Sequence, residues 1–264
     1  MRTALIHAIA LAIALPLFAQ TPQFPGATIS TVRASGDLRH QIESSSSATE
    51  KSWVGYTIPL GTERHIEICC SLDDDNVNIR TNDDALSDEA AVLYRVKDGR
   101  IASIRIFSSC AIHAHGAQIT WIEGVDPRAS VNMLYAMAKE NTSLSHKAVF
   151  ALGLHDGGTD PLIDLARHSE YSKVRSEALF WLAQSAAHKA AGALRDAVDN
   201  DPDEEVRAKA VFAISQLPND QSIPLLDELM RTHRSSAVRK KAAFWLGQKN
   251  DPRAVQAITE YLRH

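Results

Sequence analysis

The sequence predicts an α+β protein in which a small β-rich N-terminal domain precedes an α-helical repeat domain. Residues 27–125 carry β-branched residues in short alternating runs, which is typical of strands. Residues 126–264 are rich in alanine and repeat one apolar pattern about every 30 residues, which indicates stacked helical hairpins. The chain of 264 residues, 45% of them hydrophobic, is long enough for two such domains.

The first 19 residues are predicted to be a secretory signal peptide. Arg2 gives a basic start, residues 4–15 form a short apolar run, and the small residue Ala19 offers a cleavage point. The apolar run is shorter than the roughly 20 residues that a bilayer span needs, so we expect no membrane span. We therefore expect a leader at residues 20–26 and a periplasmic or secreted protein. A buried N-terminal helix is the alternative.

The pattern of residues 27–125 predicts a small sheet. Its predicted strands are Thr28–Val32, Trp53–Ile58, His65–Cys70, Ala91–Val96, Ile101–Phe107 and Gln118–Ile122. The sequence Lys97-Asp98-Gly99-Arg100 between two of them is typical of a tight hairpin. We expect Trp53, Tyr56 and Trp121 to be core aromatic residues of this sheet.

The three cysteines are the most informative residues of the β-rich domain. Cys70 and Cys110 both fall on apolar-facing positions, so in an oxidising compartment they could form a disulfide. A Cys69–Cys110 bridge is the alternative pairing. A metal site is a competing interpretation, because Cys69, Cys110, His113 and His115 carry the thiolate and imidazole groups that zinc prefers. The spacing matches no strong zinc signature, and our main expectation is no metal and no cofactor.

The C-terminal half repeats one helical pattern four times. An alanine column and a phenylalanine column recur in phase, at Ala148, Ala178, Ala210 and Ala242 and at Phe150, Phe180, Phe212 and Phe244. Each such segment is followed by turn residues and a second apolar helix, so we expect about four helical hairpins. A helix at residues 128–139 is expected to cap the first hairpin. We expect the phenylalanines to fill the space between layers.

This pattern resembles a known family. Asp201-Pro202, Val206-Arg207, Ala210 and Ile214, with their equivalents one period away, resemble HEAT-like repeats of the short bacterial type, also found in phycobilin lyase subunits. The resemblance implies a HEAT-like solenoid over residues 126–264. It implies little about activity, since such solenoids mostly bind other proteins.

The repeated Arg175, Arg207 and Arg239 are expected to form a structural ladder, each pairing with a carboxylate at a neighbouring turn. An anion-binding row is the alternative. The whole chain has 28 basic and 32 acidic residues and a net charge of −4. A nucleic-acid-binding solenoid would normally carry a positive surplus, so we expect no nucleic-acid partner.

The sequence thus predicts an exported protein-interaction or scaffold protein whose partner is another protein. No nucleophile elbow, zinc-protease helix, phosphate loop or dinucleotide fingerprint is present, so we do not expect an enzyme. If the second helix of each hairpin lines the concave face, the candidate partner-binding residues are Arg195, Asp227, Glu228 and Glu260. The alternative is a secreted metal-binding protein or hydrolase whose site surrounds the cysteine and histidine residues above.

The cysteine prediction has a direct test. Peptide mapping of the purified protein without reductant is expected to recover a cross-linked pair of peptides containing Cys70 and Cys110. Closing a loop of that length stabilises a fold by about 4 kcal/mol on the chain-entropy estimate. Free thiols at both positions would exclude the bridge.

Overall fold

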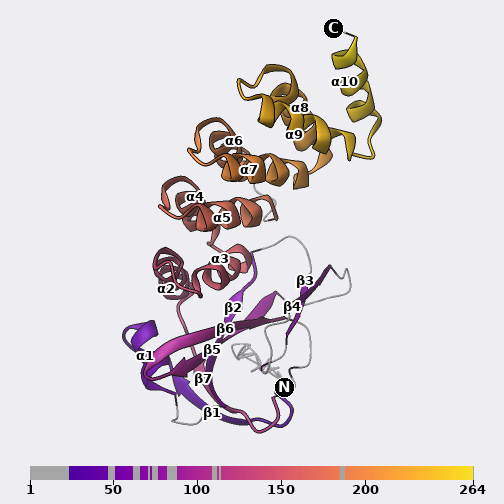
Figure 1. The fold of residues 1–264 in the computed structure, drawn as a ribbon. Coiled ribbons are helices and arrows are strands. Elements are labelled where there is room, and N and C mark those ends of the chain that lie inside the picture. Colours follow the sequence, from indigo (N-terminus) through magenta and orange to yellow (C-terminus); the bar gives the residue numbers. More distant parts are fainter. Residues whose placement is uncertain are drawn as a thin grey trace, which may run out of the picture.

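The computed structural model describes residues 24–46, 51–61, 66–70, 72, 77–81, 88–108, 112, 114–184 and 188–263. For residues 66–67, 69–70, 77–81 and 188–189 it describes the backbone alone. A β-sheet forms one end of the molecule, and helices stack away from it toward the C-terminus (Figure 1). The α+β fold class is therefore confirmed.

The sheet part contains seven strands and one short helix within the described residues. The strands are β1 (Thr28–Arg33), β2 (Ser52–Pro59), β3 (Ile66–Cys70), β4 (Val77–Thr81), β5 (Glu89–Lys97), β6 (Arg100–Phe107) and β7 (Gln118–Glu123), and the helix is α1 (Leu38–Ser44). Each of the six predicted strands has its counterpart here, and β4 and α1 are additional.

The main sheet has the strand order β1-β7-β2-β5-β6. β7 runs parallel to both β1 and β2, whereas β5 is antiparallel to β2 and β6. The predicted tight hairpin joins β5 to β6, and its central residues Asp98 and Gly99 have φ values of 52° and 70°, as a two-residue hairpin turn requires. The β3–β4 hairpin meets β6 through a bridge between Ile68 and Ser108.

The sheet is buried on both faces along its central strands β7, β2 and β5. Trp53 and Trp121 lie on one face and Tyr56 on the other, each at most 3% exposed, so the prediction of core aromatic residues is confirmed. The Tyr56 face packs against α1 and the first helix of the stack. On the Trp53 face, the guanidinium of Arg105 lies 5.9 Å from the indole ring of Trp53.

The helical part begins directly after β7. Its helices are α2 (Pro127–Lys139), α3 (Ser145–Leu154), α4 (Thr159–His168), α5 (Ser172–Gln184), α6 (His188–Asn200), α7 (Glu204–Gln216), α8 (Asn219–Thr232), α9 (Ser236–Gly247) and α10 (Pro252–Leu262). Acidic turn residues start several of them: Asp126, Asp203 and Asp251 each accept a hydrogen bond from the backbone N–H two residues later. None of the described helices has the length and apolarity needed to cross a membrane.

The helices form two layers, and the stack bends. Figure 1 shows α2, α4, α6 and α8 on the outer side of the bend and α3, α5, α7 and α9 on the inner side. The inner helices pack directly against one another, whereas the outer helices make fewer contacts with each other. The alanine column, from Ala148 to Ala242, is completely buried in the inner helices, and such small residues allow close approach. This difference in spacing between the layers bends the stack.

The sheet and the stack are joined by buried polar contacts. The hydroxyl of Tyr56 on β2 lies 2.8 Å from the hydroxyl of Tyr94 on β5 and 2.9 Å from Oγ of Ser130 on α2. Burial raises the pKa of Tyr56 to about 12 and raises that of Tyr94 well above its ordinary value. The end of β2 also pairs with the segment after α3, where Gly61 N–H donates to the carbonyl of Leu154 at 2.9 Å.

The substitution Tyr56→Phe tests this junction. It removes the hydroxyl that bridges the sheet to α2 and leaves the buried hydroxyl of Tyr94 without that partner. We expect the free energy of unfolding to fall by about 1–3 kcal/mol, measured by chemical denaturation. The control is Tyr171→Phe, because Tyr171 is 36% exposed. An equal effect of the two substitutions would contradict a structural role for the Tyr56 contacts.

Candidate functional site

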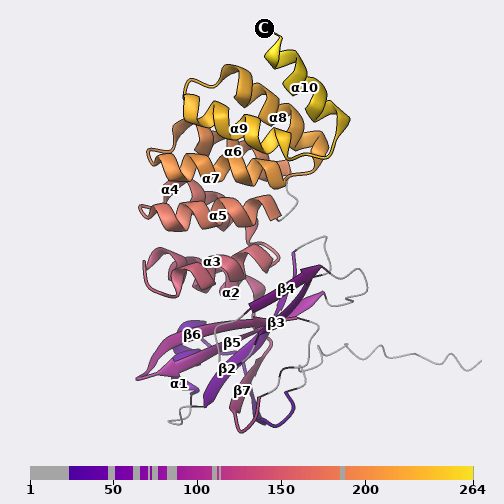
Figure 2. The ribbon, with the colours of Figure 1, turned by 45° about the vertical axis from the view of Figure 1, so that its right-hand side comes forward.

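A row of aromatic rings crosses the inner helices of the stack. Its members are Phe150, Phe180, Trp181, Phe212, Phe244 and Trp245. Neighbouring rings along this row have centroids 4.7–6.4 Å apart, so the contacts run without a gap from α3 to α9. Figure 2 shows the four helices that carry the row lying side by side.

The repeat sequence builds this row. Each inner helix supplies its repeated phenylalanine, and α5 and α9 add a tryptophan at the following position. Trp181 reaches back to Phe150 at 4.7 Å, and Trp245 reaches back to Phe212 at 4.9 Å. Gly153 on α3 makes room for the first of these indoles, since a Cβ there would lie 2.7 Å from Trp181.

The rings of this row pack against one another and are also partly exposed at the surface. Phe150, Phe180, Trp181, Phe212 and Trp245 are half-buried, and Phe244 is 55% exposed. The expectation that the phenylalanines only fill space between layers is therefore incomplete. The two tryptophans, Trp181 and Trp245, were not predicted as part of the row, although each directly follows a repeated phenylalanine.

An apolar groove lies at the C-terminal end of the row, between α7 and α9. It has a volume of about 400 Å³ and its apolar lining includes Ala208, Val238 and Phe244. Lys240 and Lys241 from α9 and Glu204 from α7 also line it. The groove thus combines apolar surface with two cations, which suits an apolar side chain with a neighbouring acidic group.

Glu177 is a half-buried carboxyl group within the same face. It lies on α5, one turn before Trp181. Burial raises the pKa of Glu177 to about 7, although the charge of Lys209 and a hydrogen bond from Trp181 act in the opposite direction. The concave face therefore contains a carboxyl group that changes its charge near neutral pH.

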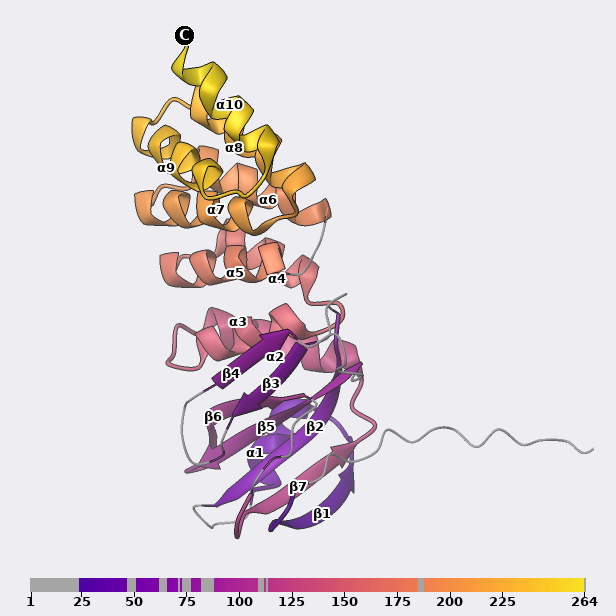
Figure 3. The same cartoon turned by 90° about the vertical axis from the view of Figure 1, so that its right-hand side faces the viewer.

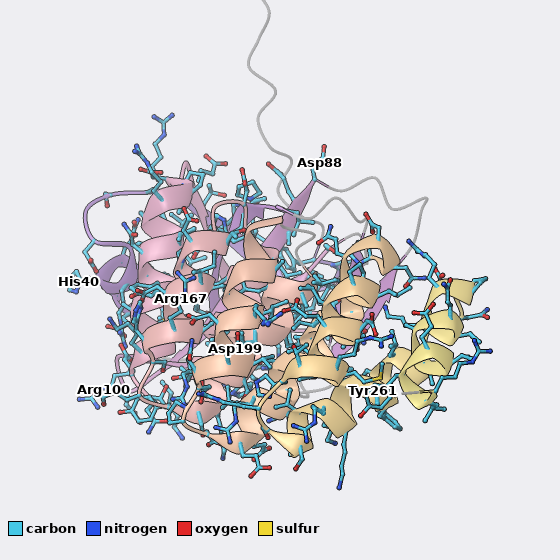
Figure 4. All side chains as sticks on the ribbon, turned by 90° about the horizontal axis from the view of Figure 1, so that it is seen from above. His40, Asp88, Arg100, Arg167, Asp199 and Tyr261 are labelled. Atoms are coloured by element: carbon cyan, nitrogen blue, oxygen red, sulfur yellow. The ribbon has the colours of Figure 1, made fainter. Side chains whose placement is uncertain are left out.

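The predicted partner-binding residues lie elsewhere, in a ladder of ion pairs. Its contacts are Arg167–Asp196, Arg195–Asp199, Arg195–Glu228, Arg231–Asp227 and Arg231–Glu260. The ladder runs through α4, α6, α8 and α10, and Arg167 and Asp199 mark its first two helices in Figure 4. All four predicted residues belong to it, and the pairs are 2.7–3.7 Å long.

The expectation that the second helices line the concave face is wrong for α6 and α8. α6 and α8, which carry Arg195, Asp227 and Glu228, lie on the outer side of the bend (Figure 1). The physical reason is that long charged side chains bridge the outer helices, whereas alanine and glycine bring the inner helices together. The charges of the ladder are paired within the molecule, and the guanidinium of Arg195 lowers the pKa of Glu228.

The three repeated arginines have a structural role. In each, Nη1 donates to the carbonyl oxygens five and six residues earlier, at 2.6–3.3 Å, which fastens the turn before its helix. Arg175 also forms a buried pair of hydrogen bonds with Asp201, at 2.8 and 3.0 Å, as the ladder interpretation predicts. The hydrogen bonds described for Arg207 and Arg239 go to backbone carbonyls, so the predicted pairing with a carboxylate is found for Arg175. One period later, His233 takes the place of Asp201 and accepts from the N–H of Ser235.

The cysteine and metal predictions fall largely outside the described residues. Cys110 and His113 are not described, and only the backbone of Cys69 and Cys70 is described, in β3. The described His115 is exposed, and Lys51 donates to its carbonyl at 3.5 Å. Among the described residues, no cluster of three or more histidine, cysteine or acidic side chains could hold a metal ion.

Comparisons with known families identify the repeats. The family model "HEAT repeats" matches residues 159–235, and the "PBS lyase HEAT-like repeat" matches residues 238–264. Residues 159–264 carry HEAT-like repeats. The resemblance drawn from Asp201-Pro202 and Val206-Arg207 is thereby confirmed. No curated protein sequence matches the chain.

Three solved structures resemble part of the chain. The complex of CpcE and CpcF of phycocyanin lyase from Nostoc sp. PCC7120 is 20% identical, with 52% of this chain and 91% of that chain covered and a TM-score of 0.39. Human deoxyhypusine hydroxylase in complex with glycerol is 19% identical. The match covers 44% of this chain and 42% of that chain, with a TM-score of 0.38. YibA of Escherichia coli is 20% identical. The match covers 50% of this chain and 53% of that chain, with a TM-score of 0.36. None of these values supports an assignment of activity.

The position of Glu177 predicts a pH-dependent stability. Because its folded pKa is about 7 and its ordinary value is 4.5, the folded state holds this proton more tightly than the unfolded state. The contribution of Glu177 to the free energy of unfolding is therefore most favourable below about pH 4.5, and it is lost as the pH rises toward 7. Glu177→Gln is expected to raise the free energy of unfolding at pH 8 by about 1–3 kcal/mol.

Denaturation curves at pH 4.5 and pH 8 measure this effect. At pH 4.5 the substitution is expected to change little, since the carboxyl of Glu177 is protonated in the folded state there. The matched control is Glu204→Gln on α7, where the side chain is exposed. If Glu177→Gln has the same effect at both pH values, the titration of Glu177 does not control stability.

Proposed function

We propose that this protein is an exported scaffold that binds another protein through the concave face of its HEAT-like repeats. It acts by binding and not by catalysis. The observation that carries the proposal is the continuous aromatic row on α3, α5, α7 and α9, which ends in the exposed ring of Phe244.

The chemistry of this face supports binding to protein. Aromatic side chains offer a large contact area at small entropic cost, and tryptophan is enriched among the residues that dominate protein interfaces. The groove beside Phe244 provides a place for an apolar anchor from the partner, and Lys240 and Lys241 favour acidic groups next to that anchor. Repeat stacks commonly use their concave surface in this way.

The ion-pair ladder is less suited to the same role. A partner that used Arg195 or Glu228 would have to compete with a contact of 2.9 Å that these residues already make with each other. Arg195, Asp227, Glu228 and Glu260 thus stay a competing prediction for the binding surface. Export is proposed from the pattern of residues 1–19 alone, and periplasmic or secreted location follows from it.

Site-specific photo-cross-linking in the producing cells tests the proposal. A photoreactive benzoylphenylalanine replaces Phe244 in one variant and Glu228, whose side chain is 52% exposed, in another. We expect a protein adduct from position 244 and none from position 228, with the adduct identified by mass spectrometry. Cell fractionation of the same cultures tests export, with the mature chain expected to start at Gln20.

The identified protein is then purified and titrated against variants. Phe244→Ser is expected to weaken binding about tenfold or more, as the loss of a central aromatic contact does. Glu228→Gln is expected to leave the affinity within about threefold. Adducts from position 228 alone would move the binding surface to the outer helices.

A further inference from the structure

β1 forms an open edge of the main sheet. It pairs with β7 on one side, and no described strand pairs with its other side. All six of its residues are exposed, including Ile29 at 41% and Val32 at 36%. Figure 3 shows β1 at the margin of the sheet, at the opposite end of the molecule from α10. This edge is therefore far from the end of the concave face that carries Phe244.

The backbone of β1 directs a defined set of N–H and C=O groups toward this edge. The N–H of Thr28 donates to the carbonyl of Ala117, the residue before β7, at 2.9 Å, and the N–H of Ala34 donates to the carbonyl of Glu123 in β7 at 2.8 Å. In a parallel pair, alternate residues direct both backbone groups to the same neighbour. Ile29, Thr31 and Arg33 therefore direct theirs to the open side. Among the described residues, only Gln41 reaches this side, where its Nε2 donates to the carbonyl of Arg33 at 2.7 Å.

The two edges of the sheet differ in protection. Beyond β6, the β3–β4 hairpin continues the pairing through two hydrogen bonds between Ile68 and Ser108, at 3.2 and 3.0 Å. β1 has less protection: its sequence TISTVR contains no proline or lysine, its register with β7 has no bulge, and only its last residue, Arg33, is charged and contacted by Gln41 of α1. Strand edges of this kind accept a further strand.

We propose that a second copy of this chain pairs with this edge, β1 to β1 and antiparallel, with Thr31 on the two-fold axis. In this register Thr31 faces Thr31 of the second copy, and Ile29 faces Arg33. Each residue that directs its backbone N–H and C=O to the open side then lies opposite a residue of the second copy that does the same. The N–H and C=O groups of the two residues can therefore hydrogen-bond to each other. The set of three is symmetric about Thr31, and that symmetry is what an isologous dimer requires.

The side chains are compatible with the same register. On one face the two threonines are directly opposite, a favourable cross-strand pair, and the aliphatic stem of each Arg33 covers an Ile29. On the other face Ser30 lies opposite Val32. The two Arg33 side chains stand at opposite ends of the pairing, roughly 13 Å apart along the strand direction. No like charges face each other, and Ile29 and Val32 lose exposed apolar surface.

A charge exchange at residue 31 tests the proposal. Sedimentation equilibrium of the wild-type protein is expected to give a concentration-dependent mass that rises to that of a dimer. Thr31→Lys and Thr31→Glu each place like charges directly opposite across the axis, so each variant alone is expected to weaken dimerisation at least about tenfold. An equimolar mixture of the two variants is expected to restore the dimer, since lysine then faces glutamate.

Ser30→Lys is the matched control. It adds the same charge to the same strand, but in the proposed register residue 30 faces Val32, so the dimer is expected to persist. A wild-type protein that stays monomeric at all concentrations would overturn the proposal. So would full dimerisation of Thr31→Lys, or a mixture that remains monomeric, because either result would exclude Thr31 from the axis. None of these outcomes depends on the proposed protein partner.

Discussion

The burial of one unbroken apolar core is the constraint on which the rest of the structure depends. A single helical hairpin cannot cover its own apolar face, so each repeat needs a neighbour. Here the same buried cluster runs from Ile42 of α1, through Tyr56 and Val92 of the sheet, to Leu134 and on to Ala257 of α10. The sheet thus serves as the first layer of the stack and removes the exposed end that a free repeat array would have.

The outer and inner sides of the stack are held together by different interactions. On the outer side, arginine and carboxylate side chains bridge successive helices, and their charges are largely satisfied within the molecule. On the inner side, small residues bring the helices close, and the large rings that cannot fit between them are displaced toward the surface. Curvature and the aromatic row therefore share one cause, which is the alternation of small and large residues in the inner helices.

Much of this fold follows from local sequence signals, and part of it does not. Alternation predicted six strands, and the hairpin at Asp98-Gly99 followed from the turn residues that positive φ requires. The helix α1 was missed because its apolar signal consists of Leu38 and Ile42 alone, and its burial depends on α2. The strand β4 was missed because a short edge hairpin contributes only Val77 and Ile79 to the pattern.

The sequence by itself determined the repeat period and the family of the repeats, because both depend on residues that lie close together along the chain. Only the tertiary structure decided which side of the stack is concave, since rotation of a helix about its axis depends on packing against distant neighbours. For the same reason, Arg195 and Glu228 were identified as polar residues of second helices, whereas their pairing with each other emerged only from the stacking of α6 on α8. The open edge of β1 is likewise a property of strand order, which the residues of one strand do not encode.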